Sequence, residues 1–246
     1  MKTTHLAIIA SVLFFAAITA CKKPSNNNPF GSALIATVDY AHNGGGRHYD
    51  LFYGAYNNLD SMHWTGTGTS AGSSGYKKFS YFGTSFNITD ETNFTYSVYA
   101  NSAGQILKVL VTDTLGFSYD GDQVRQMQEY LHTTIYPFYG YRTTYFYWKD
   151  GDLTSSSLDN ISSGFDYDLT RYGQPGDAFR MNQFLLYGRS YIKTIHLPTQ
   201  LSRNNVWSEK YLYQFDGSGR ISQMLRISNN LGITPDDTAT FAYTYR

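Results

Sequence analysis

Residues Tyr211 to Ser228 (YLYQFDGSGRISQMLRIS) carry the pattern that most limits how this chain can fold. An aromatic side chain stands at every second position up to Phe215, the turn sequence Asp-Gly-Ser-Gly follows, and a second alternating run starts at Ile221. Alternation on both sides of a glycine-rich turn is typical of a β-hairpin, because successive strand residues point to opposite faces. Weaker copies recur along the chain, with turns near Asn57, Gly83, Asn101, Gly121, Gly151 and Gly188.

The composition also favours a sheet. The chain has 23 Tyr and 16 Phe, and residues of this kind suit a pleated, half-buried surface. The turns are unevenly spaced, whereas a solenoid or propeller keeps a tight period. We therefore expect an all-β fold: a large antiparallel meander of successive hairpins, curled into a partly open barrel or roll. It would occupy residues 34–246 as a single domain.

Four segments have less regular patterns. Residues 124–131 fit a helix or a strand, and their similarity to the run after the last turn favours a strand. Residues 66–75 consist mostly of Gly, Ser, Thr and Ala, which predicts a flexible loop. Residues 155–176 are polar and irregular, which predicts a long loop with one edge strand around Phe165 and Tyr167. Residues 184–197 predict another hairpin around Gly188.

The N-terminus has the pattern of an export signal. An apolar run over residues 6–20 follows a lysine and is short for a membrane span, which needs about 20 residues. The run ends Ile-Thr-Ala-Cys21, which resembles the bacterial lipobox. The resemblance implies that residues 1–20 are a lipoprotein signal peptide and that Cys21 is the lipid attachment site, carrying acyl chains such as palmitate. Residues 21–33 would contain this cysteine and a flexible, Asn-rich tether.

Lipidation would fix both the location and the available chemistry. Two acyl chains suffice for stable anchoring, so the mature chain would stay on a membrane without spanning it. Cys21 is the only cysteine, so no thiol would remain for a disulfide, a metal site or a nucleophile. In such lipoproteins an acidic run after the cysteine often marks export to the surface, and its absence favours the periplasmic side of the outer membrane.

The net charge does not indicate a nucleic-acid partner, because Lys plus Arg and Asp plus Glu both number 19 and the chain has no excess of basic residues.

The hairpin pattern carries a family resemblance. Together with the lipobox and the tether, residues 213–221 (YQFDGSGRI) resemble uncharacterised lipoproteins of Bacteroidota. Several domains of those proteins have a porin-like antiparallel meander, so the resemblance implies that fold, and it supplies no catalytic residues. The same nine residues are similar to the YD repeat of shell-forming toxins and adhesins, although Phe215 stands where that repeat has tyrosine. We attribute this second likeness to shared hairpin physics.

No motif in the sequence predicts a catalytic or metal site. Residues 68–72 match G-x-S-x-G, but no helix pattern follows Ser70, as a hydrolase elbow requires. The histidines lack ligand spacing, and two aspartate pairs, at 120/122 and 150/152, bracket turn glycines. Asp166 and Asp168 are the pair that turn chemistry explains least. No phosphate-binding or dinucleotide-binding motif occurs, so we expect no cofactor. Beyond the leader, the histidines are His42, His48, His63, His132 and His196.

These observations favour a non-enzymatic binding or structural protein, anchored at the outer membrane by its acyl chains. Its partner would be a glycan, a lipid or an envelope protein, because exposed aromatic rings stack on sugars or bury apolar groups. The sequence assigns no ligand-binding residue. One alternative is a glycan-directed hydrolase that uses a carboxylate pair such as Asp166 and Asp168. Another is a transmembrane barrel, against which charges in the expected strands argue: Lys108, Arg125, Glu129 and Arg226.

Overall fold

The computed structural model describes residues 33–111, 114–132, 139–159, 161–204, 206–230 and 237–246. Cys21, the predicted signal peptide and nearly all of the tether lie outside these residues. The described part forms sixteen strands, one 3-10 turn (η1) and one helix (α2). Their bounds are β1 Ile35–His42, β2 Gly45–Tyr53, η1 Ala55–Asn57, β3 Leu59–Gly68, β4 Ser74–Phe82, β5 Ser85–Asp90, β6 Thr95–Ala100, β7 Ile106–Leu110, β8 Thr114–Asp120, β9 Gln123–His132, β10 Tyr139–Lys149, β11 Asp152–Leu158, β12 Ile161–Tyr172, α2 Ala178–Tyr187, β13 His196–Arg203, β14 Trp207–Phe215, β15 Ile221–Asn230 and β16 Asp237–Tyr245.

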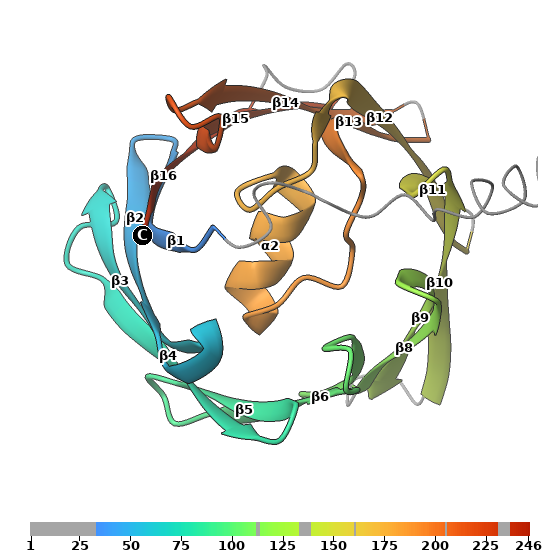
Figure 1. The fold of residues 1–246 in the computed structure, drawn as a ribbon, viewed down its shortest axis with the longest axis horizontal. Coiled ribbons are helices and arrows are strands. Elements are labelled where there is room, and N and C mark those ends of the chain that lie inside the picture. The colour runs from blue at the N-terminus through green and yellow to red at the C-terminus, as the bar shows by residue number, and fades with distance from the viewer. Residues whose placement is uncertain (1–32, 112–113, 133–138, 160, 205, 231–236) are drawn as a thin grey trace, which may run out of the picture.

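The strands form one closed antiparallel barrel (Figure 1). Each strand pairs with its neighbours in the sequence, and β1 also pairs with β16, for example at Val38 opposite Tyr243. The predicted all-β meander of hairpins is confirmed. The sheet closes completely, which leaves none of its strands with an unpaired edge.

Side chains alternate between the lumen and the outside of the barrel. One row across four strands is buried or half-buried: Tyr40, Phe241, Met224 and Tyr213. The adjacent row points the other way and is polar apart from one alanine: Asp39, Ala242, Gln223 and Gln214. Because the Tyr213 hydroxyl reaches the helix inside the barrel, the buried row is the one that faces the lumen. The barrel thus has an aromatic and aliphatic interior.

An inward tyrosine closes the open end of most hairpins. The Tyr53 hydroxyl, at the end of β2, donates to the carbonyl oxygen of Ile35 at the start of β1, 2.8 Å away. Trp148 Nε1 closes the β9–β10 hairpin in the same way. Each such bond contributes about 1 kcal/mol, and the recurrence explains why aromatic-x-Tyr repeats in the sequence. The other closing residues are Tyr81, Tyr119, Tyr167, Tyr213 and Tyr245, with bonds of 2.7, 2.8 or 2.9 Å.

Helix α2 lies inside the barrel (Figure 1). Asp177 caps its N-terminus by accepting a hydrogen bond from the Arg180 backbone N–H (2.9 Å). Gly188 ends it in the left-handed conformation, at φ 66°. The Lys77 ammonium of β4 donates to the Leu185 carbonyl oxygen (2.9 Å), at the helix end that favours a cation. Among the described residues, no helix has the length and apolar character needed to cross a bilayer.

Two segment predictions are wrong. Residues 155–176, expected to form a loop with one edge strand around Phe165 and Tyr167, lie mostly in β11 and β12. The strand at Phe165 and Tyr167 is present, but β12 is paired on both sides and is not an edge. Five of the nine residues at 155–163 are serines, and hydrogen bonding to strands on both sides overrides their weak preference for a sheet. Residues 184–197, expected to form a hairpin, complete α2 and then run to β13. Because barrel wall surrounds this helix, its apolar residues are not confined to the single stripe that marks a surface helix.

Two other segments are strands or contain them. Residues 124–131 form part of β9, as their similarity to the last hairpin predicted. The predicted loop over residues 66–75 is shorter than expected, because β3 continues to Gly68 and β4 begins at Ser74.

Candidate functional site

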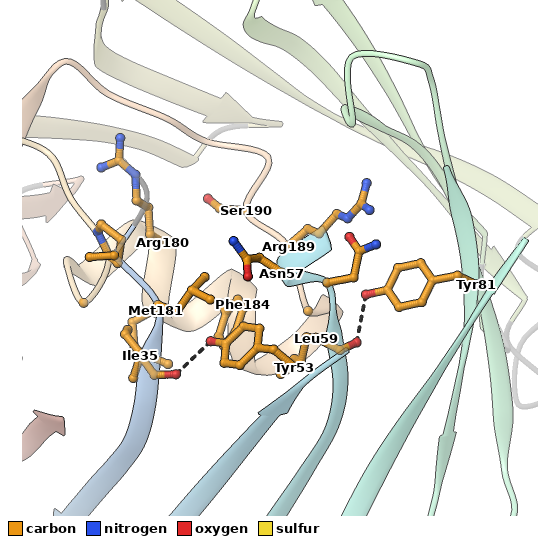
Figure 2. Close-up of a pocket in the computed structure, with 16 residues that line it drawn as sticks. Ile35, Tyr53, Asn57, Leu59, Tyr81, Arg180, Met181, Phe184, Arg189 and Ser190 are labelled. Atoms are coloured by element: carbon orange, nitrogen blue, oxygen red, sulfur yellow. Dashed lines mark hydrogen bonds between the residues drawn. The ribbon is translucent and has the colours of Figure 1, made fainter. Parts of the chain in front are cut away.

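A cavity of about 260 Å³ lies between α2 and the wall formed by the first strands (Figure 2). It is at the end of the barrel where β1 begins, beside the first described residues. Helix α2 supplies one side, and the remainder comes from β1 to β4 and the loops that flank the helix. Its lining consists of Ala33, Leu34, Ile35, Tyr53, Asn57, Asn58, Leu59, Tyr81, Pro175, Gly176, Arg180, Met181, Phe184, Gly188, Arg189 and Ser190.

One part of this lumen pocket is apolar. Ile35, Leu59 and Met181 are almost fully buried, and Phe184 packs against them from the helix. The hydroxyls of Tyr53 and Tyr81 are directed to backbone carbonyl oxygens, so both side chains present mainly their rings. Burial raises the pKa of both phenols, which therefore stay neutral at physiological pH. This part suits a hydrocarbon or aromatic group.

The other part is polar and cationic. Figure 2 shows Arg180, Arg189, Asn57 and Ser190 on the side of the pocket opposite Phe184 and Leu59. Arg180 is committed to the protein, since its guanidinium donates to Asp177 and to the Thr194 carbonyl oxygen (2.9 Å). These two bonds hold it between the helix cap and the segment before β13.

Arg189 has a different environment. Its guanidinium carbon lies 5.1 Å from the centre of the Phe86 ring and 5.9 Å from that of Tyr81. Within the described part of the chain it forms no ion pair with a carboxylate. The guanidinium lies over these rings and also interacts with the Tyr81 hydroxyl. A guanidinium carries five N–H donors, so Arg189 retains donors for a carboxylate or phosphate, which arginine binds through two parallel hydrogen bonds. Arg189 is therefore the residue best suited to hold an anionic ligand here.

Strained backbone borders the pocket. Tyr56 and Asn57 follow one another in the left-handed region, at φ 59° and 58°, and the Tyr56 side chain is 95% exposed. Asparagine tolerates this conformation, but for tyrosine it costs on the order of 1 kcal/mol or more. Strain of this kind concentrates at binding sites, and here it places Asn57 in the lining.

A second cavity of about 260 Å³ lies on the far side of the segment after α2. It shares Ser190 with the lumen pocket and contains Lys193 and Asp122. Burial is the main cause that lowers the pKa of Lys193, and the Arg180 and Arg189 charges add to it. The two cavities together give this end of the lumen a cationic character.

The predicted hydrolase pair does not lie in the lumen pocket. Asp166 is exposed on β12, opposite Gln200, with its side chain on the outer face. Asp168 Oδ1 accepts hydrogen bonds from the backbone N–H (2.9 Å) and hydroxyl (2.6 Å) of Thr170, which stabilises a local turn. These bonds hold the pKa of Asp168 below its usual value. Ser70 lies in the tight turn between β3 and β4, not before a helix.

The histidines are also separated from the pocket lining. His42 pairs with Asp237 and His196 with Asp152, while His48 lies 2.6 Å from Asp39. The hydrogen bond that His48 donates to the Asp39 carboxylate is the main cause that raises the pKa of His48. Within the described residues, no three His, Cys, Asp or Glu side chains are placed to hold a metal ion. His63 packs between Phe52 and Tyr76, and the side chain of His132 is outside the described part.

The arginines of the pocket were not predicted from the sequence. Neither belongs to a motif, and Arg189 follows the turn glycine of what was expected to be a hairpin. The Asp177 cap, with Gly188 eleven residues later, is the only sequence signal that could have identified the helix.

Solved structures with a similar fold come from Bacteroides. A porin-like protein from Bacteroides uniformis matches with a TM-score of 0.61 and 14% identity, over 86% of this chain and 96% of that one. A porin-like protein from Bacteroides vulgatus matches with a TM-score of 0.57 and 11% identity, over 87% and 99%. At these identities the likeness shows the fold alone. No family model and no curated protein matches the chain.

Proposed function

We propose that this chain is a lipoprotein of the outer membrane, anchored through Cys21, whose barrel binds a small amphipathic anion in the lumen pocket. The observation that carries the binding role is the pocket itself: an apolar wall faces an arginine that has no carboxylate partner among the described residues. The sixteen residues that line it include no carboxylate, histidine or thiol. Such a site can bind and orient a ligand. Its two phenols, Tyr53 and Tyr81, are kept neutral by the burial that raises their pKa and donate to backbone oxygens, so they do not serve as general bases.

The export signal and the lipobox support the anchor, and the solved porin-like proteins of Bacteroides support a place in an outer membrane.

The outer face of the barrel supports a water-facing rather than a membrane-spanning position. Lys78, Lys108 and Lys210 are exposed on that face near the middle of their strands. A lysine at the bilayer midplane costs about 2–4 kcal/mol, so three would cost on the order of 6–12 kcal/mol. That cost is comparable to the whole stability of a typical protein.

A chain that begins at Pro29 is therefore expected to remain in detergent-free buffer as a folded monomer or small oligomer. The full-length chain expressed with its leader is expected to sediment with membranes, and Cys21→Ser to release it. Size-exclusion chromatography, circular dichroism and membrane fractionation provide the measurements. Aggregation of the shortened chain unless detergent is added would overturn the water-facing position. Retention of Cys21→Ser in the membrane fraction would overturn the lipid anchor alone.

The chemistry of the pocket defines the ligand class. Its volume is near the lower end of small-molecule sites, which favours a single short chain or ring over a diacyl lipid. Arg189 selects a carboxylate or phosphate, because a bidentate charge-assisted pair is the strongest contact that it can make. A molecule with an anionic head and a compact apolar body satisfies both parts of the lining.

Decanoate is a suitable probe of this class. We expect isothermal titration to show saturable binding of decanoate to the chain from Pro29. Arg189→Ala is expected to weaken this binding by about tenfold or more, because a hydrogen bond to a charged group contributes about 1.5–3 kcal/mol of binding free energy. Arg203→Ala is the matched control. Arg203 stacks on Trp207 at 5.2 Å much as Arg189 stacks on Phe86, but it lies at the end of β13 remote from the pocket. Equal weakening by both substitutions, or no saturable binding, would contradict the proposal.

A further inference from the structure

A groove of about 380 Å³ crosses the outer face of the barrel over β7 to β10. It is separate from the lumen pocket, with which it shares no lining residue. Strands β8, β9 and β10 lie side by side in the wall (Figure 1). The register places the lining in two rows on the outer face: Lys108, Gly116 and Gln128 in one, and Thr114, Tyr130 and Tyr141 in the other.

Gly116 makes the hollow. It occupies the centre of its row, with Lys108 on one side and Gln128 on the other. A side chain there would meet no atom within 4 Å of its Cβ, so the space above this glycine is open. The long side chains on both sides form the walls of a trough across the strands.

Aromatic rings form the next part of the groove. The ring centres of Tyr130 and Tyr141 are 5.2 Å apart, and Tyr141 is 72% exposed. Tyr145 and Tyr147 follow on the same outer face of β10, and each is about half exposed. At about 3.3 Å per strand residue, Tyr141 and Tyr147 lie on the order of 20 Å apart. An elongated ligand could therefore contact all three rings.

The polar groups of the groove have no partner among the described residues. The Lys108 ammonium and the Gln128 amide take part in no ion pair or side-chain hydrogen bond there, and no carboxylate lines the groove. Exposed tyrosine faces with free amide, hydroxyl and ammonium groups beside them match a sugar ring. A sugar offers C–H faces for stacking and hydroxyls for hydrogen bonds. A lipid surface would instead require a continuous apolar patch.

We propose that this outer groove binds an oligosaccharide, whose rings stack on Tyr141, Tyr145 and Tyr147 while Lys108 and Gln128 hold hydroxyl or carboxylate groups. The absence of acidic side chains from the lining suits neutral and acidic sugars alike. The site would give the barrel a glycan contact on its outside, independent of the ligand in its lumen.

An array of defined oligosaccharides, including bacterial, plant and mucin-type glycans, tests the proposal with the chain from Pro29. We expect binding to at least one glycan class, with affinity lowered about tenfold by Gly116→Val, which fills the trough. Tyr141→Ala is expected to weaken binding by at least about fivefold, because it removes the most exposed stacking face. Gly116→Val should fold normally, since its Cβ meets open space and valine favours a strand.

Tyr76→Ala is the matched control, because Tyr76 is an exposed outer tyrosine on β4, which β5 and β6 separate from the groove. Its binding should equal that of the unchanged chain, and so should the binding of Arg189→Ala, which tests the lumen pocket. Thermal unfolding followed by circular dichroism checks that all variants are folded. Failure of every glycan to bind, or equal binding by the unchanged chain and Gly116→Val, would overturn the proposal without affecting the lumen ligand.

Discussion

Raising the pH above about 10 is expected to unfold this barrel cooperatively, because its interior depends on neutral tyrosines. Burial is the main cause that raises the pKa of the hairpin-closing tyrosines above the usual value of 10.0, from Tyr53 to Tyr245. The same cause raises the pKa of Tyr211 and Tyr243, whose side chains are almost completely buried. Each closing tyrosine must keep its proton to donate to a backbone carbonyl oxygen.

The sign of the effect follows from proton binding. Below pH 10 these phenols are neutral in both the folded and the unfolded chain, so they contribute no pH dependence. Above it, the unfolded chain releases protons that the folded chain keeps, and the free energy of unfolding falls as pH rises. Each such group contributes about 1.4 kcal/mol per pH unit. Tyr211 and Tyr243 alone would lower the free energy of unfolding by about 3 kcal/mol per pH unit. Together with the closing tyrosines, they would cancel a typical stability of 5–15 kcal/mol between about pH 11 and 13.

Tyrosinate absorbance and circular dichroism, recorded together against pH, measure this transition. Tyr243→Phe is an informative variant, because the Tyr243 hydroxyl has no hydrogen-bond partner among the described residues. This substitution should leave the free energy of unfolding at pH 7 equal or higher. Above about pH 10, it should make that free energy fall less steeply, by about 1.4 kcal/mol per pH unit. Tyr213→Phe loses the bond to the Pro198 carbonyl oxygen and the bond accepted from the Ala178 backbone N–H, and it should cost about 1–2 kcal/mol at pH 7. Gradual ionisation of all tyrosines with the sheet signal intact would contradict the prediction.

Replacing Asp177 by alanine is expected to lower the free energy of unfolding by about 3–5 kcal/mol. Its carboxylate is completely buried and accepts hydrogen bonds from the backbone N–H groups of Arg180 (2.9 Å) and Gln174 (3.0 Å) and from the Arg180 guanidinium. Alanine would leave these donors and a partly buried positive charge unsatisfied, which costs more than the 0.5–2 kcal/mol of a lost helix cap.

Urea denaturation measures the change, and Asp166→Ala is the control. Asp166 is exposed on the outer face, so its replacement should alter stability by no more than about 0.5 kcal/mol. Asp177→Asn should fall between the two, because an amide oxygen can still cap the helix but does not neutralise Arg180. Equal denaturation midpoints for Asp177→Ala and Asp166→Ala would show that the helix inside the barrel contributes little to stability.

The candidate site shows the limit of motif-based reasoning. Asp166 and Asp168 were the aspartate pair that turn chemistry explained least from the sequence, yet Asp166 faces outward and Asp168 stabilises a turn. Arg189 carried no signal, since its importance comes from Phe86 and Tyr81, more than 100 residues earlier in the chain. The aromatic composition was the better indication, because the exposed Tyr145 and its neighbours on the outer face of β10 form the tyrosine row beside the groove.

The hairpin from Tyr211 to Ser228 determined the repeating unit by itself. Its alternation and its Asp-Gly turn act within the β14–β15 pair, and Tyr213 closes the preceding hairpin by donating to Pro198 of β13. All three specify interactions between strands that are neighbours in the sequence. Closure, by contrast, depends on β1 meeting β16 across about 200 residues, and helix α2 is enclosed by strands from both ends of the chain. A local sequence pattern contains no information about which distant residues will pack against that segment. The tertiary structure alone therefore decided that the sheet would close, what would fill it, and where Arg189 would lie.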